Sequence, residues 1–111
     1  MDKSLYPHFI RGYFDGDGCI SQSSAGNWKV GFVSGSRLFI NGLEMCLAMH
    51  AGTSNRTIYK RESSKAHDLI YTKREDMAKL FNFFYDRYAI EKELLLPRKH
   101  KKFVQYMNSC L

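Results

Sequence analysis

Two aspartates separated by one glycine, Asp15 and Asp17 in "FDGDGCI" (residues 14–20), have the types and spacing most suggestive of chemistry. A plain turn is one interpretation, because Asp and Gly are the usual turn residues. A calcium loop is a second, but its fifth, sixth and twelfth positions would be Cys19, Ile20 and Gly26 instead of a ligand, a glycine and a glutamate. The third is a site where a carboxylate binds a divalent cation beside a substrate.

Electrostatics favour the third interpretation. If a helix over residues 4–15 ends at Asp15, both carboxylates lie at its negative end, where each is disfavoured by roughly 0.3–1 kcal/mol. A hydrogen bond to one carboxylate and a cation at the other would offset this cost. Gly12 and Gly16 are four residues apart, so they share a helix face that a second backbone can approach closely. These features predict a symmetric pair of acidic sites near a twofold axis.

Size and composition predict a single intracellular domain over residues 1–111. The chain is 44% hydrophobic and carries a net charge of +6, which suits a polyanionic partner. Its three cysteines are odd in number and form no CxxC pair, which argues against a disulfide framework or zinc ribbon and for a reducing compartment. No segment resembles a signal peptide or a membrane span, so we expect a protein of the cytoplasm or an organelle matrix.

The elements that must position the aspartates follow from periodicity and capping signals. Helices are predicted over residues 4–15, 36–52, 72–88 and from Pro97 onward, and strands over 19–23, 28–34, 56–61 and 67–72. Ser4 and Ser36 are suitable N-caps, and Thr72 with Glu75 fits a capping box. The resulting order is αββαββα plus a terminal helix, with two β-hairpins.

The residues around the two aspartates resemble the motif of a known family. The stretch "IRGYFDGDG" (residues 10–18) resembles the LAGLIDADG motif of homing endonucleases, with Gly12, Asp15, Asp17 and Gly18 at matching positions. The element order resembles that family's α+β fold, an αββαββα chain with a saddle-shaped antiparallel sheet. The stretch "LPRKHKKF" resembles the basic start of the family's last helix. Because the chain carries one copy of the motif, it resembles the homodimeric subclass of the family. Arg11 and Tyr13 replace a small and an aliphatic residue of the motif.

The resemblance implies a DNA-cleaving site. The motif helices of two subunits would pack together, and Asp17 with the Gly16 carbonyl would bind Mg²⁺ or Mn²⁺ beside the scissile phosphates. Asp15 matches the position that caps the helix end. Fixed positive charge stabilises the transition state of such hydrolysis. The implied catalytic residues are Asp17, Lys99 and Arg98, and the implied dimer interface is formed by Gly12, Tyr13, Asp15 and Gly16.

Strand alternation indicates which side chains would meet the DNA. Trp28, Val30 and Phe32 share one face, which should be the core, so their neighbours face a groove. The register of the second hairpin stays open, because Ile58 and Tyr59 compete for the inward side. The predicted DNA-binding residues are Ser21, Ser23, Asn27, Lys29, Arg37, Arg56, Lys60 and Arg61.

The leading hypothesis is a homodimeric, Mg²⁺-dependent, site-specific double-strand DNA endonuclease of a mobile intron or similar element. Its target would be long and roughly palindromic, mirroring the dimer. No membrane or small-molecule substrate is expected. Two alternatives remain open on the same fold. One is a cleavage-inactive DNA-binding regulator, since Ser34 and Ser36 stand where relatives often carry a longer polar residue. The other is an RNA-binding intron-splicing cofactor.

Overall fold

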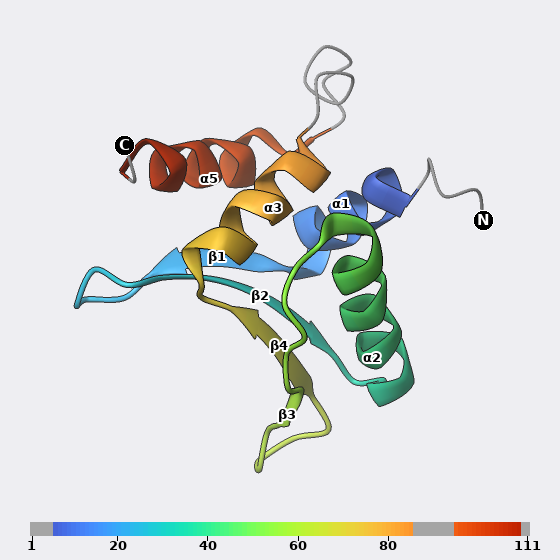
Figure 1. Cartoon of the computed structure of the whole chain (residues 1–111). Coiled ribbons are helices and arrows are strands. Elements are labelled where there is room, and N and C mark those ends of the chain that lie inside the picture. The colour runs from blue at the N-terminus through green and yellow to red at the C-terminus, as the bar shows by residue number, and fades with distance from the viewer. Residues whose placement is uncertain (1–5, 86–94, 110–111) are drawn as a thin grey trace.

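The computed structural model describes residues 6–85 and 95–109, with only the backbone described at residues 16 and 17 (Figure 1). The first helix of the chain leads directly into the first strand, and helices and strand pairs then alternate. The elements are α1 (Tyr6–Asp17), β1 (Cys19–Gln22), β2 (Trp28–Ser34), α2 (Arg37–Cys46) with a π-helical turn (Leu47–Ala51), β3 (Tyr59–Lys60), β4 (His67–Tyr71), α3 (Arg74–Phe84) and α5 (Pro97–Ser109). The αββαββα order with a terminal helix is confirmed.

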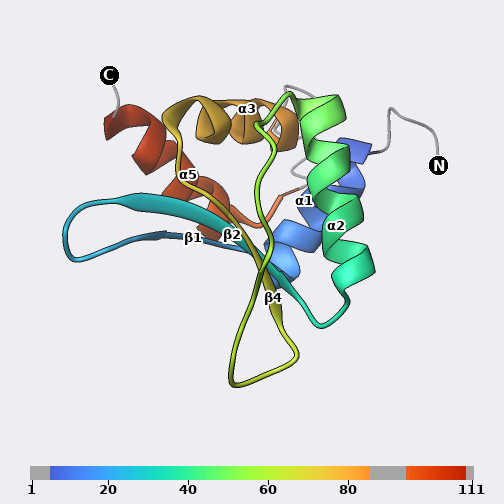
Figure 2. The same cartoon turned by 60° about the horizontal axis from the view of Figure 1, so that its bottom comes forward.

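The four strands form one antiparallel sheet in the order β1-β2-β4-β3. Helices cover one face of this sheet, and the β3–β4 end extends beyond them (Figures 1 and 2). Val30 and Phe32 of β2 and Leu69 of β4 are buried beneath the helices, as strand alternation predicts. The opposite face of the sheet is therefore left open over β1, β2 and β4.

Aromatic side chains join α1 to the rest of the core. Phe14 of α1 is fully buried and stacks on Phe84 of α3 at 5.0 Å between ring centroids, and it also contacts Phe32 and Phe103. Burial of each such side chain contributes roughly 1.5–3 kcal/mol. The predicted motif helix is thus packed centrally, between the sheet, α3 and α5.

Helix α1 ends at Asp17, two residues later than predicted. The amide of Gly18 donates to the carbonyl of Phe14 at 2.9 Å, which completes the last turn. The predicted cap Ser4 lies outside the described residues, as does Tyr88 at the predicted end of the third helix.

The third strand is much shorter than the predicted span of residues 56–61. The amide of Arg56 donates to the Glu44 carboxylate at 3.1 Å, and the amide of Ser54 donates to Asp76 at 2.8 Å. Acidic side chains of α2 and α3 therefore bind backbone amides at the start of the predicted strand and just before it, and β3 spans only Tyr59–Lys60.

The predicted capping box of Thr72 and Glu75 is wrong. The N-cap of α3 is Lys73, which makes no side-chain capping bond. By contrast, the N-cap of α2 is Ser36, as predicted, and its hydroxyl accepts from the Phe39 amide at 3.1 Å. Within residues 6–85 and 95–109, no helix has the length and apolar character needed to cross a membrane.

Candidate active site

The end of α1 and the start of β1 are held in close contact by Gly18. A Cβ atom at this position would lie 2.5 Å from Phe14 Cδ1 and 2.9 Å from the Phe14 carbonyl oxygen. Real Cβ atoms do not approach backbone so closely, so the junction requires glycine. The glycine lets β1 begin at Cys19 immediately after the helix, and the acidic motif is thereby placed at the edge of the sheet.

Lys99, from the first turn of α5, binds the C-terminal end of α1. Its Nζ donates to the carbonyl oxygens of Phe14 at 2.6 Å, Asp15 at 2.9 Å and Gly18 at 2.5 Å. It also lies 5.3 Å from the centroid of the Phe14 ring. Because the C-terminal end of a helix carries partial negative charge, an ammonium group there is favoured.

Asp15 makes the reverse connection, from α1 to the start of α5. Its Oδ2 accepts from the Leu96 amide at 2.9 Å, immediately before Pro97 opens the helix. Its Oδ1 is buried and has no hydrogen-bond partner among the described residues. Burial raises the pKa of Asp15, while the Leu96 amide and the nearby charges of Lys99, Arg11 and His100 act in the opposite direction. The expected hydrogen bond to one motif carboxylate is therefore present.

The other motif acid, Asp17, is the last residue of α1, directly before Gly18. The side chain of Asp17 lies outside the described part of the structure, and only the backbone is described at Gly16. Arg98 is exposed on α5, next to Lys99. In the described part of the chain, no group of three His, Cys, Asp or Glu residues is arranged to hold a metal ion. The described protein atoms thus contain no complete metal cage.

One side of α1 is open to solvent. Gly12 is exposed, and a Cβ atom built there would meet nothing within 4 Å. Phe9, three residues earlier, is 52% exposed, and its spacing from Gly12 places it on the same helix face. Of the predicted interface residues, Gly12 lies on this open side, whereas the Tyr13 hydroxyl and the Asp15 carboxylate bind within their own chain.

Arg11 and Tyr13, the two residues that differ from the usual motif, both point into their own chain. The Tyr13 hydroxyl donates to the Val33 carbonyl, and its ring lies 4.9 Å from that of Phe39. Arg11 is 3% exposed, and it donates to the Phe84 carbonyl at 2.8 Å. Both substitutions therefore leave the side of α1 that carries Gly12 uncovered.

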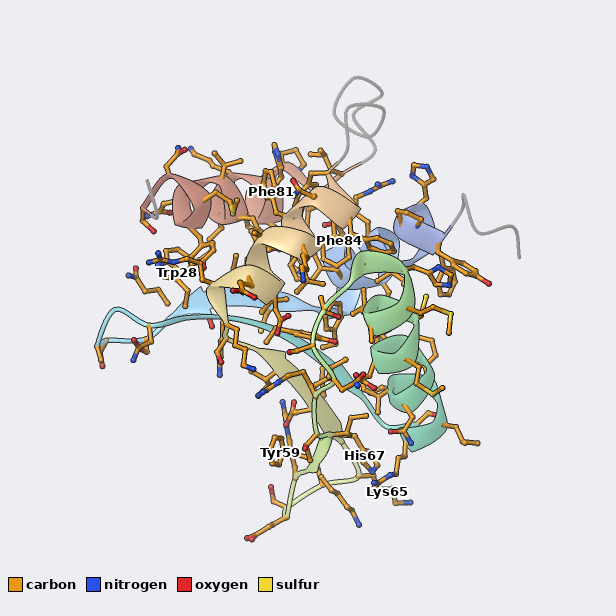
Figure 3. The ribbon with its side chains drawn as sticks, viewed as in Figure 1. Trp28, Tyr59, Lys65, His67, Phe81 and Phe84 are labelled. Carbon is orange, nitrogen blue, oxygen red and sulfur yellow. The ribbon has the colours of Figure 1, made fainter. Side chains whose placement is uncertain are left out.

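The open face of the sheet follows from the strand register. Ser21 pairs with Lys29, and Val33 pairs with Asp68, which in turn pairs with Tyr59 of β3. The side chains of these residues lie on the face of the sheet opposite to that of the buried residues Val30, Phe32 and Leu69. Figure 3 shows Tyr59 and His67 at the end of the sheet that extends beyond the helices. The inward–outward ambiguity of the second hairpin is thereby resolved, with Tyr59 outward and 56% exposed.

The register also separates two neighbouring predicted DNA-binding residues. Lys60 pairs with His67, which is buried on the core side, so Lys60 lies on the face opposite Tyr59. Arg61 instead reaches Asp68 on the open face, with Nε to Oδ2 at 2.7 Å and Nη2 to Oδ1 at 2.9 Å. No local pattern in the sequence points to Asp68, because only the pairing of β3 with β4 brings it to Arg61.

The remaining predicted DNA-binding residues are spread around this face. Ser23 and Asn27 close the β1–β2 turn, since the Asn27 amide donates to the Ser23 hydroxyl at 3.2 Å. Arg37 is exposed at the first position of α2. Arg56 is half-buried, and its Nε donates to the Ile70 carbonyl at 3.0 Å. Of the eight predicted residues, the structure thus brings Ser21, Lys29 and Arg61 onto the open face.

The fold resembles that of a solved homing endonuclease. An archaeal intron-encoded homing endonuclease, I-Vdi141I complexed with DNA, is similar with a TM-score of 0.66 and 13% sequence identity, over 96% of this chain and 67% of that one. The homing endonuclease I-CvuI, in complex with the I-CreI target, gives a TM-score of 0.47 and 15% identity, over 84% and 65% of the two chains. No curated protein sequence matches the chain significantly.

The sequence itself identifies the family. Residues 5–84, which include the motif, both hairpins and α3, match the family of the LAGLIDADG-like domain. The similarity therefore extends well beyond the nine motif residues. By this match over most of its length, supported by the fold, the chain belongs to the LAGLIDADG-like domain family, the domain of LAGLIDADG homing endonucleases.

Proposed function

We propose that this chain is one subunit of a homodimeric, Mg²⁺-dependent endonuclease that cuts both strands of a specific DNA site. The observation that carries the proposal is the end of α1. There the acidic motif meets the edge of an open sheet face, and Lys99 and Asp15 fix its backbone from both sides. An acid-bearing helix end that is held in place beside an open sheet face suits hydrolysis of a bound phosphodiester.

The donor chemistry of the motif fits a hard cation. Asp17 and the Gly16 carbonyl offer oxygen ligands, the kind that Mg²⁺ and Mn²⁺ prefer. A site with few protein ligands suits a cation that DNA phosphate oxygens help to hold. A metal bound there supplies a water of lowered pKa and stabilises the leaving oxygen. The chain's own part is to hold Asp17 and the Gly16 carbonyl at the helix end.

Arg98 and Lys99 supply positive charge next to these ligands. Lys99 neutralises the negative end of α1 while binding its carbonyls, and this lets a second anion, the scissile phosphate, approach. Arg98 is exposed and can reach phosphate directly. A fixed cation beside the phosphate stabilises the charge that develops in the transition state.

Two subunits would combine through the open side of α1. Gly12 has space for another backbone, and Phe9 beside it is a large exposed apolar group that a partner would cover. The two open sheet faces would then lie along one duplex, with Ser21, Lys29 and Arg61 toward the bases. Ser23, Asn27 and Arg37 would contact the backbone.

The proposal is tested by selecting bound duplexes from a randomised pool in Ca²⁺, adding Mg²⁺, and sequencing the ends. Wild-type protein is expected to recover a near-palindromic site and to cut both of its strands. Asp17→Asn removes the proposed metal carboxylate with little change in size, so it should bind the same site in Ca²⁺ and leave it intact in Mg²⁺.

The alternative functions give different results in this experiment. A site that is recovered but stays intact with wild-type protein in Mg²⁺ and Mn²⁺ would identify a DNA-binding regulator. A structured RNA that outcompetes every duplex would identify a splicing cofactor. Cleavage that survives Asp17→Asn would disprove the assigned mechanism.

A further inference from the structure

We propose that Arg61, oriented by Asp68, reads a guanine in each half of the DNA target. The inference rests on the proposed function, in which the open sheet face lies against the duplex. It adds a specificity-determining pair to that face: one arginine that contacts the base and one aspartate that positions it.

The geometry of the pair supports this role. Asp68 occupies the Nε and Nη2 side of the guanidinium through two hydrogen bonds of 2.7 and 2.9 Å. Among the described residues, nothing accepts a hydrogen bond from Nη1. The end of the guanidinium formed by Nη1 and Nη2 is therefore available, and the Arg61 side chain is 52% exposed while that of Asp68 is 19% exposed. The aspartate thus lies beneath the arginine and directs its outer edge away from the sheet.

The backbone beneath the pair is fixed as well. Asp68 is paired on both sides within the sheet, with Val33 of β2 and Tyr59 of β3. The Arg61 amide donates to the Ala66 carbonyl at 3.0 Å, which closes the hairpin between them. An arginine whose backbone and carboxylate partner are both fixed loses less conformational entropy on binding than a free one.

The charge balance argues against a simple phosphate contact. Asp68 cancels the charge of Arg61, and a carboxylate beside a phosphate would repel it. Base reading depends instead on two correctly placed donors. In the major groove guanine offers two acceptors, O6 and N7, whereas adenine offers one acceptor and one donor. Two parallel N–H groups at the guanidinium end match guanine alone.

The decisive variants separate the geometry of the Arg61 guanidinium from its positive charge. Arg61→Lys retains the positive charge but lacks the planar fork. Asp68→Ala retains the arginine but removes its positioning partner. Lys60→Ala is the matched control, because it lies on the same hairpin but on the opposite face of the sheet. The probes are the duplex selected in Ca²⁺ and a set in which each base pair is replaced in turn, and the readout is equilibrium binding in Ca²⁺.

The wild-type protein should prefer guanine at one position of each half-site by about 5- to 150-fold, the range of a good bidentate contact. Arg61→Lys should abolish this preference at that position only, and Asp68→Ala should weaken it there while leaving affinity for unrelated duplex equal or higher. Lys60→Ala should leave every base preference unchanged.

Failure of this inference can be distinguished from failure of the proposed function. If wild-type protein selects a site but Arg61→Lys keeps all of its base preferences, the arginine reads no base and the inference is overturned while the proposed function stands. If Asp68→Ala changes no preference, the positioning role is overturned. If wild-type protein selects no duplex, the proposed function fails, and the inference fails with it.

Discussion

Lys99 and Asp15 connect the ends of two helices in both directions. The Lys99 ammonium of α5 donates to the Asp15 carbonyl of α1 at 2.9 Å, and the Asp15 carboxylate accepts from the Leu96 amide, at the start of α5, at 2.9 Å. Each residue thus satisfies backbone groups that a helix end leaves without partners. The acidic motif is held by α5, although the two residues are 84 positions apart in the chain.

Replacing Lys99 should destabilise the fold measurably. Lys99→Met leaves the carbonyls of Phe14, Asp15 and Gly18 without their charged donor, so we expect the free energy of unfolding to fall by about 1–3 kcal/mol. Urea unfolding followed by the fluorescence of Trp28, the only tryptophan, measures this. Lys101→Met removes an equal charge from an exposed position of α5 and should change little. Equal stability of the two variants would contradict the capping role.

Asp15 should make stability depend on pH in an unusual direction. Because burial raises the pKa of this carboxyl in the folded state, its contribution to stability is fully present below the unfolded value of 3.8. It is lost as the pH rises through the folded pKa. Asp15→Asn cannot ionise but retains an oxygen for the Leu96 amide. The stability of wild type relative to this variant should therefore decrease as pH rises above 3.8.

The measurement is urea unfolding of both proteins across this pH range. A difference in unfolding free energy that is flat, or that grows in favour of wild type with rising pH, would show that hydrogen bonding and the neighbouring cations outweigh burial at Asp15.

The two glycines of the motif should respond oppositely to alanine. Gly12→Ala fills open space in mid-helix, so the isolated subunit should gain up to about 1 kcal/mol, while the added methyl should weaken dimerisation. Gly18→Ala forces a contact with Phe14 backbone and should cost about 1–3 kcal/mol. Thermal unfolding at low protein concentration and sedimentation velocity over a concentration series separate the two effects.

An unchanged dimer constant for Gly12→Ala would place the dimer interface elsewhere on the subunit. A stable Gly18→Ala protein would mean that the α1–β1 junction can open without loss of packing.

Local patterns were sufficient to predict most elements of this fold. Strand alternation identified Val30 and Phe32 as core residues, Ser36 was recognised as a cap, and Pro97 marked the start of α5. Each of these signals depends on residues within one or two turns of each other, which is why the sequence alone carries it. A local pattern of the same kind gave a wrong prediction for the capping box of Thr72 and Glu75. There Asp76, in the first turn of α3, accepts a hydrogen bond from the distant Ser54 amide.

The sequence by itself determined the motif, the element order and the family of this protein. The tertiary structure decided how the site is held: that Lys99 binds the carbonyls at the end of α1, that Asp68 orients Arg61, and that Lys60 lies on the opposite face. Those relationships depend on strand register and helix packing between residues distant along the chain. A shift of one residue in register exchanges the two faces of a strand, and no local pattern near Ile58 and Tyr59 fixed that choice.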